Sequence, residues 1–272
     1  MKTRIITGLV LGSAFITAIM MLNPFHLALL FSVLIIMGAF EWSKLSGVDS
    51  LVFKIFYAAL LVLLMIYGWK FLQLSDSIIP LMVTAACWWL LALVWVMSYP
   101  MGEQKNTVNT MVKLFSGILV LLPAWIGLLY LHQQYSASWV LYIMIMIWVA
   151  DSGAYFSGKK WGKRKLAPKV SPGKSWEGVY GAITACVFYA IIGVWWLDIQ
   201  SESIIYFILL SLLIVPVSVL GDLYESMLKR HSGHKDSGNI LPGHGGIMDR
   251  IDSLTAAVPV FVLGILLLGI KI

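Results

Sequence analysis

Carboxylates recur at the ends of the last apolar stretches of this sequence. Asp151 and Asp222 each close an apolar run, while Asp249 and Asp252 stand three residues apart just before the final one. Residues three or four apart share one face of a helix, so several of these acids can converge at one membrane surface. Hard oxygen ligands of this kind suit Mg²⁺, which binds through one or two carboxylates plus substrate phosphates. The alternative is a set of helix-end charges that face water or pair with lysines and arginines.

Basic residues lie among these acids. If the helix carrying Asp222 continues, Glu225 and Lys229 share its face through four-residue spacing. Arginine clamps phosphate oxygens in bidentate fashion and lysine acts as a point charge, which favours phosphate binding by Lys229, Arg230, Lys235 and Arg250. A second basic loop, 158–178, is equally compatible with attraction to lipid headgroups and with substrate binding; it contains Lys159, Lys160, Lys163, Arg164, Lys165, Lys169 and Lys174.

A glycine-rich turn, "PGHGG" at 242–246, precedes the last acidic pair. Gly245 and Gly246 let the backbone approach a ligand closely, and a helix that starts there would offer free N–H groups to an anion. Taken alone, such a turn is more often an ordinary loop. With "DRID" directly behind it, the turn supports a site for phosphate and metal. The nearby histidines His231, His234 and His244 do not predict zinc, because no cysteine or HExxH motif accompanies them.

The elements that must position these residues are membrane helices. The chain has 272 residues, of which 60% are hydrophobic and 12% charged, and a soluble domain carries about twice that charged fraction. Apolar runs long enough to cross a bilayer recur and predict an all-α polytopic bundle in one integral membrane domain, 1–272. No soluble basic module for nucleic acid is present. The predicted spans are 5–22, 26–40, 52–69, 78–99, 112–131, 138–157, 179–197, 204–223 and 254–270.

The distribution of positive charge predicts the orientation of the bundle. With a cytosolic N-terminus and nine spans, all but Lys70 and Lys271 of the 19 lysines and arginines fall on the cytosolic side. The positive-inside rule therefore favours an arrangement with the N-terminus inside and the C-terminus outside. Both polar loops then face the cytosol at the depth of the lipid headgroups. The residues up to this point indicate an enzyme that acts on a phospholipid, a nucleotide or both.

The stretch "SMLKRHSGHKDSGNILPGHGGIMDRID" (226–252) resembles the signature of the phosphatidate cytidylyltransferases, also called CDP-diacylglycerol synthases. Two further stretches are similar to that family, "WVADSGAYFSGK" (148–159) and "SPGKSWEG" (171–178). The resemblance implies transfer of a cytidylyl group from CTP to phosphatidate, giving CDP-diacylglycerol and pyrophosphate in phospholipid biosynthesis. It also implies a bacterial-type cytoplasmic membrane, a homodimer, and a catalytic half at 138–272 behind N-terminal spans at 1–137.

The resemblance further implies a role for each matching position. Asp222 and Asp249 are expected to hold Mg²⁺, with a second cation such as K⁺ left open, and Asp236 and Asp252 to support them. The residues expected to bind the triphosphate and the phosphatidate head are Lys229, Arg230, Lys235 and Arg250. The remaining substrate site is expected to comprise Asp151, Ser171, Lys174, Trp176, Glu177, His244, Gly245 and Gly246.

Two other functions share some of these features. A CTP-dependent lipid kinase would use the same metal, basic loops and spans, but would release CDP and would need a base for its alcohol substrate. A transporter would place its polar site near the bilayer midplane, whereas the polar residues here gather at one surface.

Overall fold

The fold is a bundle of helices with one small hairpin at its edge. The computed structural model describes residues 2–74, 77–238 and 245–270, with side chains from residue 12 onward. Within these ranges nine α-helices follow one another along the chain: α1 (Lys2–Met21), α2 (Pro24–Leu45), α3 (Leu51–Leu74), α4 (Ile79–Met97), α5 (Thr107–Tyr130), α6 (Ala137–Trp161), α7 (Trp176–Trp196), α8 (Ile204–Ser232) and α9 (Met248–Leu268). A π-helical turn, Leu131–Tyr135, extends α5, and a 3₁₀ turn, Ser201–Ser203, leads into α8.

This arrangement confirms the predicted all-α membrane bundle. Eight of the helices, α2 to α9, are long and apolar enough to cross a membrane, and the described side chains of α1 form a shorter apolar stretch, Gly12–Met21. The protein is therefore an integral membrane protein. The orientation of the bundle stays a prediction.

Several helices extend beyond the predicted spans, and the extensions carry the polar residues. α8 continues to Ser232, well past the predicted end at 223, and α9 begins at Met248, where the prediction placed its start at 254. Asp151 was predicted to close the sixth span, but it lies inside α6, which runs on to Trp161. Hydropathy detects only the apolar part of a helix, so it misses turns that leave the hydrocarbon region but keep their backbone hydrogen bonds.

Local signals explain where several helices begin and end. The side chain of Asn23 accepts a hydrogen bond from the N–H of His26, and Pro24 occupies the first helical position of α2. Asn106 caps α5 in the same way. Gly233, at a φ of 75°, ends α8 in the left-handed conformation that glycine adopts without strain.

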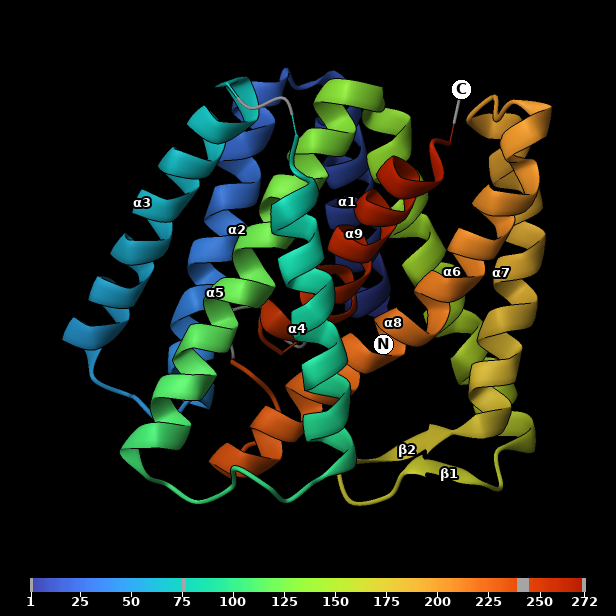
Figure 1. Ribbon diagram of the computed structural model, residues 1–272. Coiled ribbons are helices and arrows are strands. Elements are labelled where there is room, and N and C mark those ends of the chain that lie inside the picture. Colours follow the sequence, from blue (N-terminus) through green and yellow to red (C-terminus); the bar gives the residue numbers. More distant parts are fainter. Residues whose placement is uncertain (1, 75–76, 239–244, 271–272) are drawn as a thin grey trace.

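Helices α8 and α9 form the centre of the bundle. They pack against each other, α8 also contacts α2, α4 and α7, and α9 also contacts α4, α5 and α6. Figure 1 shows α8 crossing the bundle obliquely toward the end where the hairpin lies. Buried aromatic rings fill the space around the second half of α8, for example Trp42 of α2 and Trp89 of α4 against Tyr224. The last turns of α8 are therefore held from several sides.

A two-stranded antiparallel hairpin joins α6 to α7, where only a loop was expected. It pairs β1 (Lys165–Ala167) with β2 (Ser171–Ser175) in the register Lys165 to Ser175 and Ala167 to Ser171. Glu177, in the first turn of α7, accepts hydrogen bonds from the backbone N–H groups of Lys163 and Arg164 and from Nε of Arg164. Glu177 thus fixes the base of the hairpin, and β2 keeps a defined place beside α8.

Small residues let α6 and α7 approach closely. A Cβ atom added to Gly181 of α7 would lie 1.9 Å from Oγ of Ser157 and 2.8 Å from the carbonyl oxygen of Gly153, both in α6. Membrane helices associate largely through such close packing. A side chain at Gly181 would therefore force the backbone of α6 away and weaken the contact between the two helices.

We expect Gly181→Ala to lower the thermal midpoint of the detergent-solubilised protein, because overpacking a tight contact costs about 1–3 kcal/mol. Differential scanning fluorimetry measures this midpoint. Gly12→Ala is the matched control, since a Cβ atom at Gly12 meets nothing within 4 Å. Equal midpoints for the two variants would contradict the close packing of α6 and α7.

Candidate active site

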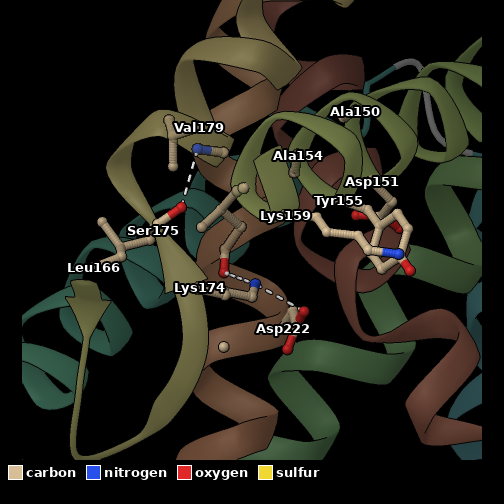
Figure 2. Close-up of a pocket in the computed structure, with 14 residues that line it drawn as sticks. Ala150, Asp151, Ala154, Tyr155, Lys159, Leu166, Lys174, Ser175, Val179 and Asp222 are labelled. Carbon is tan, nitrogen blue, oxygen red and sulfur yellow. Dashed lines mark hydrogen bonds and ion pairs between the residues drawn. The ribbon is translucent and has the colours of Figure 1, made fainter. Parts of the chain in front are cut away.

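A cavity of about 460 Å³ opens where β2, α6, α7 and α8 meet. Its charged lining consists of Asp151 and Lys159 from α6, Lys174 from β2 and Asp222 from α8. Figure 2 shows the side chains of Lys174 and Asp222 pointing toward each other across the cavity wall. The cavity therefore brings together Lys174 of the first basic loop with Asp151 and Asp222, three residues that the sequence assigned to the site.

An ion pair between Lys174 and Asp222 dominates this cavity. Lys174 Nζ lies 2.7 Å from Oδ2 of Asp222 and 3.4 Å from the carbonyl oxygen of Val219. Ser226, one turn further along α8, donates to the other carboxylate oxygen at 3.1 Å. Both charged side chains keep part of their surface open, 23% for Lys174 and 32% for Asp222. A ligand can therefore reach each of them.

Three other residues predicted for this part of the site do not line the cavity. Ser171 is a half-buried residue of β2, Trp176 is exposed at the start of α7, and Glu177 is engaged by the backbone of the hairpin. Their proposed contact with substrate stays a prediction. Through its contacts with the hairpin, Glu177 holds β2, and with it Lys174, in position.

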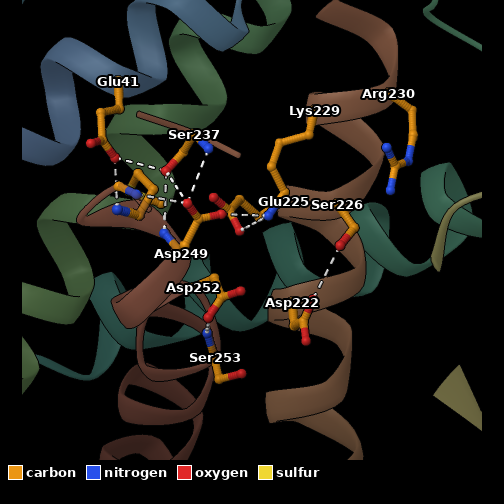
Figure 3. A network of polar contacts seen from close by, with 12 residues as sticks. Glu41, Asp222, Glu225, Ser226, Lys229, Arg230, Ser237, Asp249, Asp252 and Ser253 are labelled. Carbon is orange, nitrogen blue, oxygen red and sulfur yellow. Dashed lines mark hydrogen bonds and ion pairs between the residues drawn. The ribbon is translucent and has the colours of Figure 1, made fainter. Parts of the chain in front are cut away.

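A second polar cluster lies further along α8, toward its C-terminal end. Lys229 is its centre: Nζ donates to Oε2 of Glu225 at 2.8 Å and to Oδ1 of Asp249 at 2.7 Å. Glu225 and Lys229 share one face of α8 because the helix continues, and Asp249 comes from the first turn of α9. Figure 3 shows this cluster between the two helices. Because all three groups are largely buried, their ion pairs are only weakly screened by water.

Asp249 is held by four donors. Besides Lys229, the backbone N–H and the hydroxyl of Ser237 donate to Oδ2 at 3.1 and 3.0 Å, and the N–H of Gly246 donates at 2.8 Å. Two described positions of the connection between α8 and α9, Ser237 and Gly246, are thus held by this carboxylate. Ser237 was not among the predicted site residues.

Glu41 of α2 closes the network from the other side. Glu41 is 5% exposed and accepts hydrogen bonds from the N–H groups of Ile247 and Met248 at 3.0 and 2.8 Å. Its Oε2 also lies 2.9 Å from the hydroxyl of Ser237, whose single proton it shares with Asp249. Ile247 provides no side-chain cap to α9, so Glu41 supplies the missing acceptor from a distant helix. A carboxylate at a helix N-terminus is favoured by both the free N–H groups and the helix dipole.

The glycines beside α9 make room for this network. A Cβ atom on Gly246 would lie 2.1 Å from Oγ of Ser237 and 2.4 Å from Oε2 of Glu41, and one on Gly238 would lie 2.3 Å from Oε1 of Glu41. Gly245 has a φ of 82°, which favours glycine at that turn. The space at Gly246 is therefore occupied by protein carboxylate and hydroxyl groups. Whether Gly245 and Gly246 also admit phosphate stays a prediction.

The other predicted residues occupy different surroundings. Arg230 points away from Asp249 and donates from Nε to the carbonyl oxygen of Val170 in the hairpin turn at 3.2 Å (Figure 3). Lys235, Asp236 and Arg250 are exposed. His244 lies outside the described residues.

Asp252 lies one turn after Asp249, with Oδ1 accepting from the N–H of Ser253 at 2.7 Å. It lies close enough to Asp222 and to Glu225 for an electrostatic interaction with each. Asp252 therefore stands between the cavity and the Lys229 cluster and links the two.

The donor chemistry of this region fits a hard divalent cation. Oε1 of Glu225 is buried and has no hydrogen-bond partner among the described residues. The nearby side chains of Asp249 and Asp252 offer further carboxylate oxygens, which are hard ligands. In the described part of the chain no three histidine, cysteine, aspartate or glutamate side chains form a complete metal cage. Mg²⁺ does not need one, because it commonly takes one or two protein carboxylates and completes its shell with water and phosphate oxygens.

Comparison with known proteins agrees with this chemistry. The sequence profile described as the cytidylyltransferase family matches residues 2–268. The chain belongs to the cytidylyltransferase family. It is 44% identical over 264 residues to the phosphatidate cytidylyltransferase of Pseudomonas aeruginosa, covering 96% of this chain and 95% of that protein. The resemblance seen in the sequence is therefore confirmed.

More distant members of the cytidylyltransferase family match along nearly the whole chain as well. The phosphatidate cytidylyltransferase of Haemophilus influenzae is 40% identical over 280 residues, covering 96% of this chain and 97% of that protein. That of Thermotoga maritima is 32% identical over 266 residues, covering 96% and 94%. The match therefore includes the N-terminal spans, which contain no motif recognisable from the sequence alone.

Sequence reasoning missed Glu41 and Ser237. Glu41 was outside the predicted second span, 26–40, although it is the one acid in the otherwise apolar run "MGAFEW". An ionisable residue at the edge of a membrane helix is a functional candidate by default, and that signal could have identified it. Ser237 carried no such signal, because a serine beside glycine and aspartate is common in loops.

We expect Glu41→Gln to loosen the start of α9. The glutamine amide keeps one acceptor oxygen but replaces the other with an NH₂ donor, which would face the donors Ser237, Ile247 and Met248. Each lost hydrogen bond to a charged group costs about 1.5–3 kcal/mol. Hydrogen–deuterium exchange of peptides covering 245–252 should accelerate on the order of tenfold or more. Glu202→Gln, an exposed acid before α8, is the control. Unchanged exchange in Glu41→Gln would show that Glu41 does not hold this turn.

Proposed function

We infer that this protein transfers the cytidylyl group of CTP to phosphatidate, producing CDP-diacylglycerol and pyrophosphate. Membership of the cytidylyltransferase family supports this inference, as do the relatives that bear the name phosphatidate cytidylyltransferase. The observation that carries it is a set of two lysine–carboxylate pairs that each include one residue of α8: Lys174 of β2 with Asp222, and Lys229 with Asp249 of α9. Such paired charges suit a reaction between two phosphate-bearing substrates.

The reaction needs positioning and charge neutralisation more than proton transfer. A phosphatidate oxygen attacks the α-phosphorus of CTP, a new P–O bond forms, and the bond from the α-phosphorus to the bridging oxygen breaks to release pyrophosphate. A phosphomonoester has a second pKa of about 6 and is mostly dianionic near neutral pH, so the nucleophile requires no general base. Fixed positive charge near the developing phosphate charge should therefore carry most of the catalysis.

The basic residues would divide this task by position. Lys174 lies in the open cavity and can exchange its contact with Asp222 for a phosphate oxygen, since both side chains are partly exposed. Lys229 is fixed between two acids and would mainly set the geometry of Asp249. Arg230 would reach the ligand from the hairpin side, and Lys235 and Arg250 from the exposed surface.

Asp222 and Asp249 would hold Mg²⁺, with Asp252 between them. A bound Mg²⁺ would neutralise phosphate charge and orient the triphosphate. A second cation such as K⁺ remains an open part of the proposal. Asp236 is exposed and would act only by holding basic residues in place.

The proposed location follows from charge and hydropathy. With the basic loops inside, the cavity and the Lys229 cluster would face the cytosol of a bacterial cytoplasmic membrane, where CTP is available. The proposed catalytic part is 138–272 within one domain, and Glu41 shows that a residue from 1–137 contacts it. A homodimer is a further part of the proposal and comes from the family resemblance.

The direct test is a single assay with purified protein, Mg²⁺, labelled CTP and phosphatidate, in which pyrophosphate and labelled lipid are both quantified. We expect the two products in equal amounts, and we expect Asp249→Asn to abolish turnover while the protein still inserts into the membrane. Asp222→Asn should do the same and should perturb folding less, because Asp222 is more open. Lys70→Ala, an exposed lysine near the end of α3, should leave activity near that of the wild type.

Other outcomes of this assay would identify a different function. Release of CDP in place of pyrophosphate would indicate a lipid kinase. Substrate flux into vesicles without any chemical product would indicate a transporter. Near-normal turnover by both aspartate variants would overturn the assignment of the metal site.

Lys174→Met tests the cavity separately from the Lys229 cluster. Loss of one charged contact to the developing phosphate charge should reduce kcat/KM on the order of 100-fold, with little effect on the thermal midpoint because the lysine is partly exposed. Lys169→Met in the hairpin turn is a matched control, since Lys169 is exposed and does not line the cavity. Equal kinetics for the two variants would remove Lys174 from the proposed substrate site.

A further inference from the structure

A second cavity, of about 220 Å³, lies at the same end of the bundle and shares no lining residue with the first. It is enclosed by the C-terminal end of α2, the connection from α4 to α5, the first turns of α5, and the C-terminal end of α8. Figure 1 shows these segments at the end of the bundle where the hairpin also lies. Neither the predicted site nor the proposed reaction uses this cavity.

The lining of this cavity is strongly positive. Lys44, Lys105 and Lys113 contribute from three different segments. The single acid of the lining, Asp49, is already engaged, because Lys54 donates a hydrogen bond to it. That ammonium holds the pKa of Asp49 below its usual value, so its charge is balanced by Lys54. The three lysines therefore leave a net positive charge in the cavity.

Two of the lining residues are largely buried: Lys113 forms no ion pair in the described part of the chain, and the ring nitrogens of His231 have no partner there. Lys113 is 5% exposed and His231 is 4% exposed. Burial of a charge or of a polar group without a partner costs free energy. An anion in the cavity would satisfy both side chains.

Helix ends do not account for these residues. Lys44 lies in the last turn of α2, where a cation is favoured by the helix dipole. Lys113, by contrast, lies two turns after the start of α5, and Lys105 precedes that start, so both are at the end where a helix favours an anion. The helix dipole therefore does not favour these two cations, and an anion between them and the helix N-terminus would offset that repulsion.

We propose that this second cavity is a binding site for a phosphate group, held by Lys113, Lys105 and Lys44 with His231 as a hydrogen-bonding partner. Phosphate offers several strong acceptor oxygens, and a cluster of lysines from separate segments can surround it. His231 and Lys229 are two residues apart in α8 and so lie on opposite faces of the helix. A phosphate bound here would contact the same turns of α8 that hold Lys229 against Asp249.

The phosphate could come from a soluble molecule or from a lipid headgroup, and one titration distinguishes them. The full chain carrying Lys174→Gln, which weakens the first cavity, is placed in phosphatidylcholine nanodiscs and titrated with inorganic pyrophosphate by calorimetry. We expect saturable binding that weakens on the order of tenfold when Lys105→Gln is added, as for loss of one charge-assisted contact. Lys105 is exposed, so this variant should fold.

His231→Phe provides a second variant that keeps the stacking of the ring on Tyr99, whose centroid is 5.5 Å away, and removes both nitrogens. It should weaken binding as well, whereas Lys70→Gln should not. Loss of pyrophosphate binding when phosphatidylglycerol is included in the nanodiscs would assign the site to a lipid headgroup, and unchanged binding would assign it to a soluble phosphate. Equal affinity in the Lys105→Gln, His231→Phe and Lys70→Gln variants, or no saturable binding at all, would overturn the proposal.

Discussion

The buried carboxylate of Glu41 determines where α9 begins, and the geometry of the site depends on that start. A helix that begins inside a membrane protein has N–H groups that water cannot reach, and each one left unpaired is costly. Glu41 accepts from Ile247 and Met248 and also from Ser237. The loop and the helix are thereby held together by one side chain from α2. Asp249, in the first turn of α9, consequently faces Lys229.

Helix α8 carries both parts of the site. Its continuation past the apolar region places Asp222 and Ser226 one turn apart, and Glu225 and Lys229 likewise. Asp222 lines the cavity beside β2, and the second pair faces α9. Because the same rigid helix carries both pairs, their separation is fixed by helical geometry alone. The oblique course of α8 across the bundle (Figure 1) brings its end against α2 and α4 as well as α7.

The sequence predicted the helical class and the family, because hydropathy and motifs are local properties. Helical spacing predicted that several carboxylates, Asp222 and Asp249 among them, can converge at one surface, and their joint role stays a prediction. The sequence did not predict the hairpin, whose strands are short and polar and depend on Glu177 for their place. Nor did it predict the partnership of Glu41 with Ile247, which lies 206 residues further along the chain. Contacts over such separations leave no trace in spacing, and an acid of this kind is visible only as an exception in an apolar run.

The balance of charge around Lys229 explains why such a site would need both metal and lysines. Two acids, Glu225 and Asp249, contact the single ammonium group of Lys229, so this cluster has no spare positive charge to attract a triphosphate. Arg230 points to the hairpin and adds none to it. A cation bound by the carboxylates would supply that charge, while Lys174 supplies positive charge on the side of the open cavity. In the proposed reaction these acids would select a metal-bound phosphate over a free one, because only the metal-bound form would bring positive charge to them.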